Sequence, residues 1–169
     1  MKITIVRGDI TVFDVDAIVN AANRSLLGGG GVDGAIHRAA GPELLDECLK
    51  IRKEELIKGL PTGQVVLTKG YNLAAKNIIH TVGPINGKDD IMLLKDCYIN
   101  SLRLAEKNNF KTIAFPSIST GSYGMSIIEA VKIVKDVLKN FETSIIEEVI
   151  LVLHSQADYA IYTSEFYNQ

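Results

Sequence analysis

Hydrophobic residues recur along the chain with two alternating periods. Short runs of apolar and β-branched residues predict strands at 2–7, 17–20, 64–70, 76–82, 112–115 and 148–153. Longer segments with apolar residues three or four positions apart predict helices at 34–40, 42–58, 90–106, 127–138 and 157–166. Because strands and helices alternate, the pattern predicts an α/β fold with helices on both faces of a mixed sheet. The strands 64–70 and 76–82 are expected to be antiparallel, since the connection between them is short.

The composition is typical of one globular domain. The 169 residues are 47% hydrophobic and 22% charged, which is sufficient for a full core. Eighteen basic and 20 acidic residues give a formal net charge of −2, which argues against a surface for nucleic acid or anionic membranes. The chain shows no signal peptide and no apolar run of membrane-spanning length, so we expect a cytoplasmic protein.

The two cysteines fall on apolar faces of predicted helices. Cys48 and Cys97 are therefore expected to be core residues rather than a disulfide or a metal-binding pair. In the helix at 42–58, the spacing places Leu45 and Leu49 on the same buried face as Cys48.

A block of glycines holds the strongest candidate chemistry. Five of the seven residues from 28 to 34 are glycine, and the block leads into a predicted helix. Glycine lets backbone N–H groups approach a ligand closely, and a helix N-terminus attracts anions. A flexible linker is the alternative, but such linkers do not normally run into an amphipathic helix. We therefore interpret the block as a phosphate-binding loop with one carboxylate, Asp33, beside it.

A second loop, residues 116–124, follows the predicted strand at 112–115. It combines hydroxyl groups, two glycines and Tyr123. Its N–H and O–H donors suit a second anion site, and Tyr123 could face a sugar or a base; a β-turn is the alternative interpretation. Because both loops leave the carboxyl ends of predicted strands, we expect them at the sheet edge where α/β proteins bind ligands. Two such loops indicate two phosphates, or one diphosphate held between them.

Three polar side chains near the strand ends have open roles. Asn20 and Asn23 flank the end of the second predicted strand, where they could bind ribose hydroxyls or form turns. Asp9 follows the first predicted strand and is better explained as a turn cap than as an acceptor for a base.

The histidines do not form a metal-binding pattern. His37, His80 and His154 are far apart in the sequence, without ligand spacing. His37 follows Asp33 by one helical turn, so their side chains can meet. His80 lies inside an apolar strand and is expected to be a hydrogen-bonded core residue. The sequence also lacks a Walker A motif, a clean dinucleotide fingerprint and a Gly-x-Ser-x-Gly elbow.

Taken together, several motifs resemble the macrodomain family, specifically its MacroD-like hydrolases. The matching stretches are 8–11, 16–23, 27–41 (LGGGGVDGAIHRAAG), 61–64, 79–84 and 115–124. The resemblance implies a three-layer α/β/α sandwich with a mixed sheet, in which residues 1–169 form a single macrodomain. It also implies that the protein binds ADP-ribose without a metal ion or cofactor.

The same resemblance implies which residues bind ADP-ribose. A carboxylate would accept from the adenine amino group, backbone amides would hold the diphosphate, and an aromatic residue near the last helix would face the adenine. Asp9 and Ile10 are implied at the adenine, with Tyr159, or alternatively His154, as the aromatic residue. Asn20 would support Asn23 or the loop. The residues implied at the diphosphate and distal ribose are Gly31, Val32, Ser119, Thr120, Gly121, Ser122 and Tyr123.

The chemistry implied by the resemblance is hydrolysis of an ester at the distal ribose. Asp33 would orient or activate water, and Asn23 would hold the ribose hydroxyls. Neighbouring phosphates are expected to raise the pKa of Asp33 and make it a better base. The implied substrates are O-acetyl-ADP-ribose and proteins that carry ADP-ribose on Asp or Glu. A non-catalytic reader of ADP-ribose and a phosphatase acting on ADP-ribose phosphorylated at the distal ribose are the alternatives, whereas nucleic-acid binding would require a basic face.

Overall fold

Within residues 1–168, which this computed structural model describes, six strands form one mixed sheet. The strands are β1 (Lys2–Arg7), β2 (Ala17–Ala22), β3 (Val65–Lys69), β4 (Asn77–Val82), β5 (Thr112–Phe115) and β6 (Glu148–Leu153). Their order across the sheet is β1-β6-β5-β2-β4-β3. Strand β3 is antiparallel to β4, and every other neighbouring pair is parallel. The mixed sheet and the antiparallel pair predicted from the sequence are confirmed.

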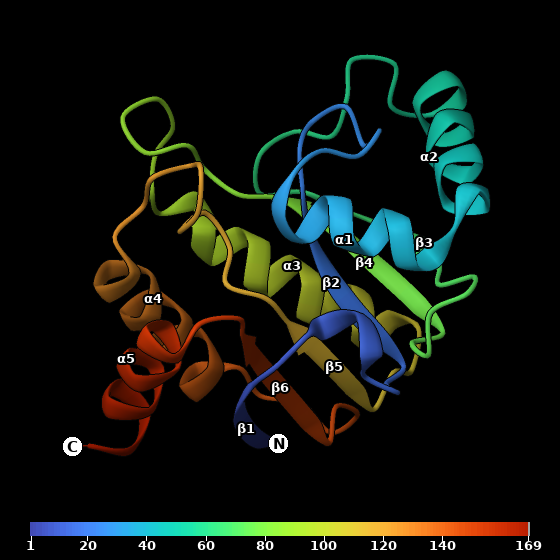
Figure 1. Ribbon diagram of the computed structural model, residues 1–169. Helices are drawn as coiled ribbons and strands as arrows, with labels where there is room; N and C mark the ends of the chain where they lie inside the picture. The colour runs from blue at the N-terminus through green and yellow to red at the C-terminus, as the bar shows by residue number, and fades with distance from the viewer. Residues whose placement is uncertain (169) are drawn as a thin grey trace.

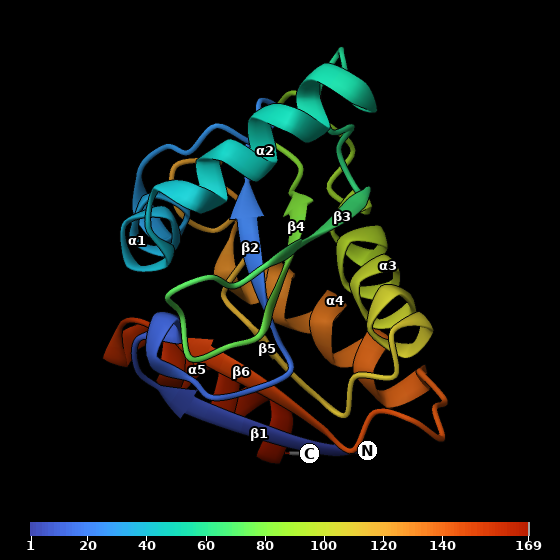
Figure 2. The ribbon, with the colours of Figure 1, turned by 90° about the vertical axis from the view of Figure 1, so that its right-hand side faces the viewer.

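Helices cover both faces of this sheet (Figure 1). They are α1 (Gly31–Ala40), α2 (Pro42–Glu54), α3 (Leu93–Lys107), α4 (Ile127–Asn140) and α5 (Gln156–Tyr167). Helices α1 and α2 pack on one face, and α3, α4 and α5 pack on the other (Figure 2). The predicted three-layer α/β/α sandwich is therefore confirmed. None of the helices in residues 1–168 is both long and apolar enough to cross a membrane.

Each face of the sheet has its own hydrophobic core. Ile36 and Cys48 belong to the core under α1 and α2, and Cys97 and Leu102 belong to the core under α3, α4 and α5. Both cysteines are buried free thiols, as expected for core residues. Because side chains alternate between the faces of a strand, a central strand with helices on both sides is apolar at nearly every position.

Strand β2 departs from this pattern at one position. Ile18 and Ala22 point toward α1 and α2, whereas Val19 points toward the opposite core. Asn20 lies between these positions, shares the face of Ile18, and is completely buried. A polar side chain at such a position requires hydrogen-bond partners, because an unpaired buried amide is costly.

Helix α1 begins earlier than the sequence pattern predicts. It starts at Gly31 instead of residue 34, so Asp33 lies in its first turn. Glycine is a poor helix former, and the pattern therefore located the start after the last glycine. The helix dipole favours a carboxylate in this turn, which offsets part of the cost of the glycines.

Helix α2 buries a different face from the expected one. Its buried residues are Leu44, Cys48 and Ile51, while Leu45 and Leu49 are 37% and 46% exposed. Adjacent apolar residues give two possible stripes rotated by one position, and the periodicity alone does not choose between them. The helix also ends before the expected position, residue 58.

The carboxyl ends of the parallel strands lie at one edge of the sheet. The paired positions of β1 and β6 end together, and so do those of β2 and β4. Among the described residues, β2 pairs with β5 at two positions, where Ala17 meets Ile113 and Ile18 meets Ala114. Strand β2 then continues from Val19 to Ala22 without pairing with β5. The glycine loop and the loop at 116–124 follow these two strands, so they leave the sheet on either side of this unpaired stretch.

Candidate functional site

The glycine loop delivers free backbone donors to the edge of the sheet. Gly30 is the N-cap of α1, and no side chain caps the N–H groups of the first turn. These groups and the helix dipole make the turn suitable for binding an anion. Gly29, Gly30 and Gly31 are exposed. At Gly34, an added Cβ would collide with the carbonyl oxygen of Gly29, so the loop folds back on the helix in a way that only glycine permits.

Asp33 lies under this turn with its carboxyl group directed into the protein. The residue is 5% exposed, and its Oδ1 accepts a hydrogen bond of 2.9 Å from Nδ2 of Asn20. Nε2 of His37 lies 3.5 Å from the same oxygen, which confirms that the two side chains meet. Burial raises the pKa of Asp33, and the Asn20 bond and the charge of His37 oppose the increase. Burial within the protein is the largest cause of this rise, and the effect expected from neighbouring phosphates stays a prediction.

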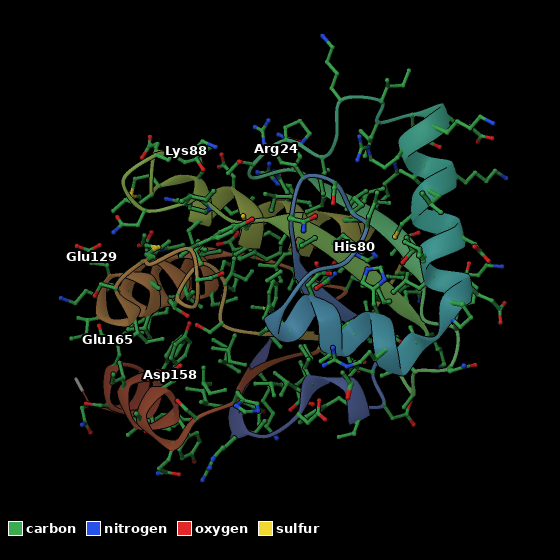
Figure 3. The ribbon with its side chains drawn as sticks, turned by 45° about the horizontal axis from the view of Figure 1, so that its top comes forward. Arg24, His80, Lys88, Glu129, Asp158 and Glu165 are labelled. Atoms are coloured by element: carbon green, nitrogen blue, oxygen red, sulfur yellow. The ribbon has the colours of Figure 1, made fainter. Side chains whose placement is uncertain are left out.

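Asn20 supports Asp33 from below. Its amide nitrogen bonds to Asp33 and lies 3.1 Å from Nδ1 of His80, a residue that is completely buried between the sheet and α1 and α2 (Figure 3). Asn20 therefore contacts Asp33 on α1, whereas the role implied from the sequence was support for Asn23 or the glycine loop. The expectation that His80 is a hydrogen-bonded core residue is confirmed. Burial lowers the pKa of His80 to about 3, so its ring is neutral.

Asn23 holds the chain that leads into the glycine loop. Its Nδ2 donates to the carbonyl of Gly28 at 3.0 Å, and its Oδ1 accepts from the hydroxyl of Ser25 at 2.6 Å. Asn23 therefore forms a turn before the glycine loop, and its contact with ribose hydroxyls stays a prediction. An added Cβ at Gly29 would lie 3.3 Å from Nδ2 of Asn23 and 3.3 Å from Oδ2 of Asp33. The amide and the carboxylate are thus neighbours of the same glycine, which brings together the two residues expected to be catalytic.

The second loop is braced from inside by its hydroxyl groups. The hydroxyls of Ser117 and Thr120 lie 2.6 Å apart, and the N–H of Met125 donates to the carbonyl of Ser119 at 2.9 Å. Ser119 has a positive φ of 68°, and its buried hydroxyl lies where a Cβ on Gly83 would be. Any contact of Ser119 with a ligand must therefore come from its backbone. Gly121 and Ser122, by contrast, are exposed.

The charge of Asp33 acts on Tyr123 of the second loop. Its side chain is half-buried, and its pKa is raised by burial and by the neighbouring carboxylates of Asp33 and Asp89. Its carbonyl accepts from the N–H of Asn86 at 2.9 Å, which ties the loop to the segment after β4. The charge of Asp33, which lies beside Gly29 of the glycine loop, therefore also affects the second loop.

The residues expected at the adenine lie after the ends of β1 and β6. Asp9 caps the short 3-10 helix η1 (Ile10–Val12), because its Oδ1 accepts from the N–H and the hydroxyl of Thr11 at 2.9 and 2.7 Å. These bonds lower the pKa of Asp9, and the nearby His154 contributes in the same direction. The expected cap is confirmed. Both bonds use Oδ1, so Oδ2 can still accept from a ligand.

The remaining candidates near Asp9 differ in exposure. Ile10 is buried, so its side chain belongs to the core under α1 and α2. His154 is exposed directly after β6, and Tyr159 is half-buried on α5, where it packs against the opposite core. Both residues remain candidates for the aromatic group on the adenine side.

Two supporting residues were not found from the sequence. Arg52 of α2 donates to the carbonyls of Leu56, Ser25 and Ile57 at 2.8, 2.9 and 3.1 Å, which joins the chain before the glycine loop to the chain after α2. Thr68 of β3 lies 2.8 Å from Nε2 of His80. A single arginine or threonine gives no sequence signal for such contacts. In the described part of the chain, no three His, Cys, Asp or Glu side chains are grouped to hold a metal ion.

The sequence is similar to proteins of one family. The model of the Macro domain family matches residues 19–134, which include both loops. The chain is 50% identical over 170 residues to Macro domain-containing protein TTE0995 of Caldanaerobacter subterraneus subsp. tengcongensis, covering 98% of this chain and 95% of that protein. It is 47% identical to the O-acetyl-ADP-ribose deacetylase of Escherichia coli, covering 95% of this chain and 93% of that protein.

Solved structures show the same likeness. The Oceanobacillus iheyensis macrodomain with ADP is similar with a TM-score of 0.92 at 50% sequence identity, over 95% of this chain and 87% of that one. The Trypanosoma brucei macrodomain in complex with ADP-ribose is similar with a TM-score of 0.87 at 40% identity, over 95% of this chain and 67% of that one.

Proposed function

Because this chain belongs to the Macro domain family, we propose that it binds ADP-ribose and hydrolyses an ester at the distal ribose, with O-acetyl-ADP-ribose as substrate. The resemblance to macrodomains found in the sequence is confirmed. Relatives about as similar as the Escherichia coli protein carry the name O-acetyl-ADP-ribose deacetylase, and the macrodomain structures above contain ADP or ADP-ribose. The protein is accordingly a hydrolase of that substrate class.

One observation carries the assignment of the chemistry to particular residues. The carboxylate of Asp33 and the amide of Asn23 both border Gly29, next to the uncapped N-terminus of α1. A diphosphate held by the amides of Gly31 and Val32, with residues 119–123 opposite, would place the distal ribose beside both side chains. Tyr123 would then pack against that ribose. At the other end, Asp9 would accept from the adenine amino group.

The reaction requires a water molecule and a proton acceptor. Asp33 orients the water and takes one proton as its oxygen attacks the acyl carbon. The bond between the acyl carbon and the ribose oxygen then breaks, and the proton passes to that oxygen. The products are ADP-ribose and acetate. A raised pKa suits Asp33 to this role, since a stronger base accepts the proton more readily. Asn23 keeps one amide hydrogen for the ribose hydroxyls.

We extend the proposed activity to a larger ester. In a protein modified on Asp or Glu, the acyl group is a side chain in place of acetate, and the bond that breaks is again an ester at the distal ribose. We include such proteins among the substrates, in a single macrodomain over residues 1–169. The free thiols of Cys48 and Cys97 favour a reducing compartment, and we place the activity in the cytoplasm.

Turnover of two defined substrates tests this proposal. O-acetyl-ADP-ribose and a glutamate-linked mono-ADP-ribosyl protein are incubated with the wild type, Asp33→Ala and Asn23→Ala. We expect release of ADP-ribose by the wild type and a loss of at least about 100-fold in kcat for Asp33→Ala. Calorimetry with ADP-ribose shows whether the variants still bind. Binding without turnover by the wild type would identify a reader, and release of inorganic phosphate from ADP-ribose phosphorylated at the distal ribose would identify a phosphatase.

A further inference from the structure

Four buried polar side chains form a continuous chain that ends at Asp33. Thr68 on β3 contacts His80 on β4, His80 contacts Asn20 on β2, and Asn20 contacts Asp33 on α1. The three contacts measure 2.8, 3.1 and 2.9 Å. The four residues are between 0% and 5% exposed, so water does not compete for these bonds. Asn20 and His80 are register partners on adjacent parallel strands, which fixes their separation.

The direction of each bond follows from Asp33. Nδ2 of Asn20 donates to Oδ1 of Asp33, so the amide nitrogen, and not the amide oxygen, faces the carboxyl group. The same nitrogen faces Nδ1 of His80, and Nδ1 must therefore be the acceptor. The ring proton is then on Nε2, where it is donated to the Thr68 hydroxyl. That hydroxyl in turn donates to the carbonyl of Lys69 at 3.3 Å.

From this chain we infer that Thr68 and His80 are positioning residues for the hydrolysis, which hold the Asn20 amide in the orientation that binds Asp33. The inference rests on the proposed function for its catalytic consequence. His80 supplies the acceptor for the second N–H of Asn20, so the amide cannot turn its oxygen toward Asp33 without losing both bonds. Thr68 accepts the Nε2 proton and thereby keeps Nδ1 free of a proton. Neither residue touches the ligand.

The locations of these residues argue for a role beyond packing. Each of the three strand positions faces the core under α1 and α2, where an apolar side chain would pack without any polar group to satisfy. The chain begins at an edge strand and extends under two further strands to reach a single carboxylate. If Thr68 only satisfied the ring of His80, the connection from His80 through Asn20 to Asp33 would not be needed.

The charge state of Asp33 depends on this arrangement. The bond from Asn20 lowers the pKa of Asp33 against the effect of burial. The charge of His37, on the same helix, lowers the pKa of Asp33, and the charge of Asp33 raises the pKa of Cys48 on α2 and of Tyr123 on the second loop. His80 on β4 is connected to Asp33 through Asn20. Loss of the Thr68 acceptor frees the ring proton to move to Nδ1, where it opposes the amide of Asn20. The pKa of Asp33 then rises, and the acid limb of the kcat profile moves to higher pH.

Substitution of Thr68 tests the inference through turnover. Thr68→Val keeps the shape of the side chain and removes its hydroxyl, and Thr68→Ser is the matched control that keeps it. We expect Thr68→Val to lower kcat about tenfold, equal to about 1.4 kcal/mol and within the range of one net hydrogen bond. KM and the Kd for ADP-ribose should stay within about twofold, and the acid limb should move upward. Thr68→Ser should restore kcat and the pH profile. Wild-type kcat in Thr68→Val, or an equal loss of affinity, would overturn the inference.

Nuclear magnetic resonance gives a readout that does not require turnover. In the wild type, the ring nitrogens of His80 should show a proton on Nε2 and a bare Nδ1 from pH 5 to 9. In Thr68→Val, this single tautomer should be lost, and the carboxyl carbon of Asp33 should titrate at higher pH. A wild-type proton on Nδ1, or an unchanged Asp33 titration, would remove the positioning role even if the enzyme hydrolyses its substrate. If the protein gives the expected spectra but does not hydrolyse the substrate, the hydrogen-bonded arrangement stands and the proposed function is rejected.

His80→Asn provides a second variant in case Thr68→Val does not fold. The amide oxygen of asparagine can occupy the position of Nδ1 and accept from Asn20, whereas leucine cannot. We expect His80→Asn to retain more of the wild-type kcat than His80→Leu, with the Asp33 titration following the same order. Equal activities and equal titrations in the two variants would contradict the inference.

Discussion

Nε2 of His37 lies 3.5 Å from Oδ1 of Asp33, one turn earlier on α1. The distance is long for a hydrogen bond but short for an interaction between charges. A positive His37 lowers the pKa of Asp33. We therefore expect His37→Gln to shift the acid limb of the kcat profile to higher pH. In the wild type this limb should lie above 3.8, the ordinary pKa of an aspartate, because burial raises the Asp33 pKa.

The profile is measured with O-acetyl-ADP-ribose between pH 4 and 9. Lys132→Gln, on the exposed surface of α4, is the control for a change of one positive charge. A limb at the same pH in His37→Gln and the wild type would show that this contact does not act on the base.

Asp33 should reduce the stability of the fold at neutral pH. A carboxyl whose pKa is raised on folding favours the folded state below the unfolded pKa, and this contribution is lost as the pH rises through the folded pKa. Asp33→Asn keeps an acceptor for Asn20 and removes the buried charge. We expect its Tm at pH 7 to exceed that of the wild type by a few degrees, with the difference vanishing below about pH 3.8. Thermal unfolding at both pH values checks this, and a lower Tm at pH 7 would refute it.

Gly34→Ala should disrupt the glycine loop. The new Cβ would collide with the carbonyl of Gly29 and lie 3.0 Å from the guanidinium of Arg38. We expect a loss of about 1–3 kcal/mol in the free energy of unfolding and weaker binding of ADP-ribose. Gly30→Ala is the matched control for stability, because its Cβ meets nothing within 4 Å and its φ is −88°. Urea unfolding and calorimetry give the two quantities, and equal stabilities of the two variants would contradict the prediction.

Gly83→Ala should disturb the second loop from beneath. Its Cβ would displace the hydroxyl of Ser119 and lie 2.6 Å from Cγ2 of Ile118. We expect a loss of about 1–3 kcal/mol in the free energy of unfolding. The Kd for ADP-ribose should rise, since the second loop moves away from the glycine loop. The double variant Gly83→Ala with Ser119→Gly removes one of the two obstacles and should recover part of the stability. No recovery in the double variant would show that Ser119 is not the obstructing group.

Much of the fold could be predicted from local sequence patterns. The bounds of β1, β5 and β6 follow directly from runs of apolar residues, because buried strands leave little other pattern. Cys97 was likewise expected on an apolar helix face, and it lies on the buried face of α3 with Leu94 and Tyr98. The face of α2 could not be predicted, since Leu44 and Leu45 are equally apolar and tertiary packing decides between them.

The candidate site was predictable only in part. The glycine loop, Asp33 and the second loop stand out in the sequence because glycine, hydroxyl and carboxylate residues are concentrated there. The series of hydrogen bonds from Thr68 through His80 to Asn20 could not be predicted, because it depends on how three strands are aligned with one another. Strand register is set by long-range pairing, so no local sequence pattern around Thr68 indicates its contact with His80.

The short ladder between β2 and β5 has a consequence for how the protein responds to its ligand. Two paired positions join the halves of the sheet that carry the two loops. A molecule bound by both loops would connect these halves at the edge of the sheet where β2 and β5 are not paired. Occupancy should then slow amide hydrogen exchange in Val19–Ala22 and in the residues after Phe115, well beyond the groups that touch the ligand. Recognition and stiffening of the sheet would be one and the same event.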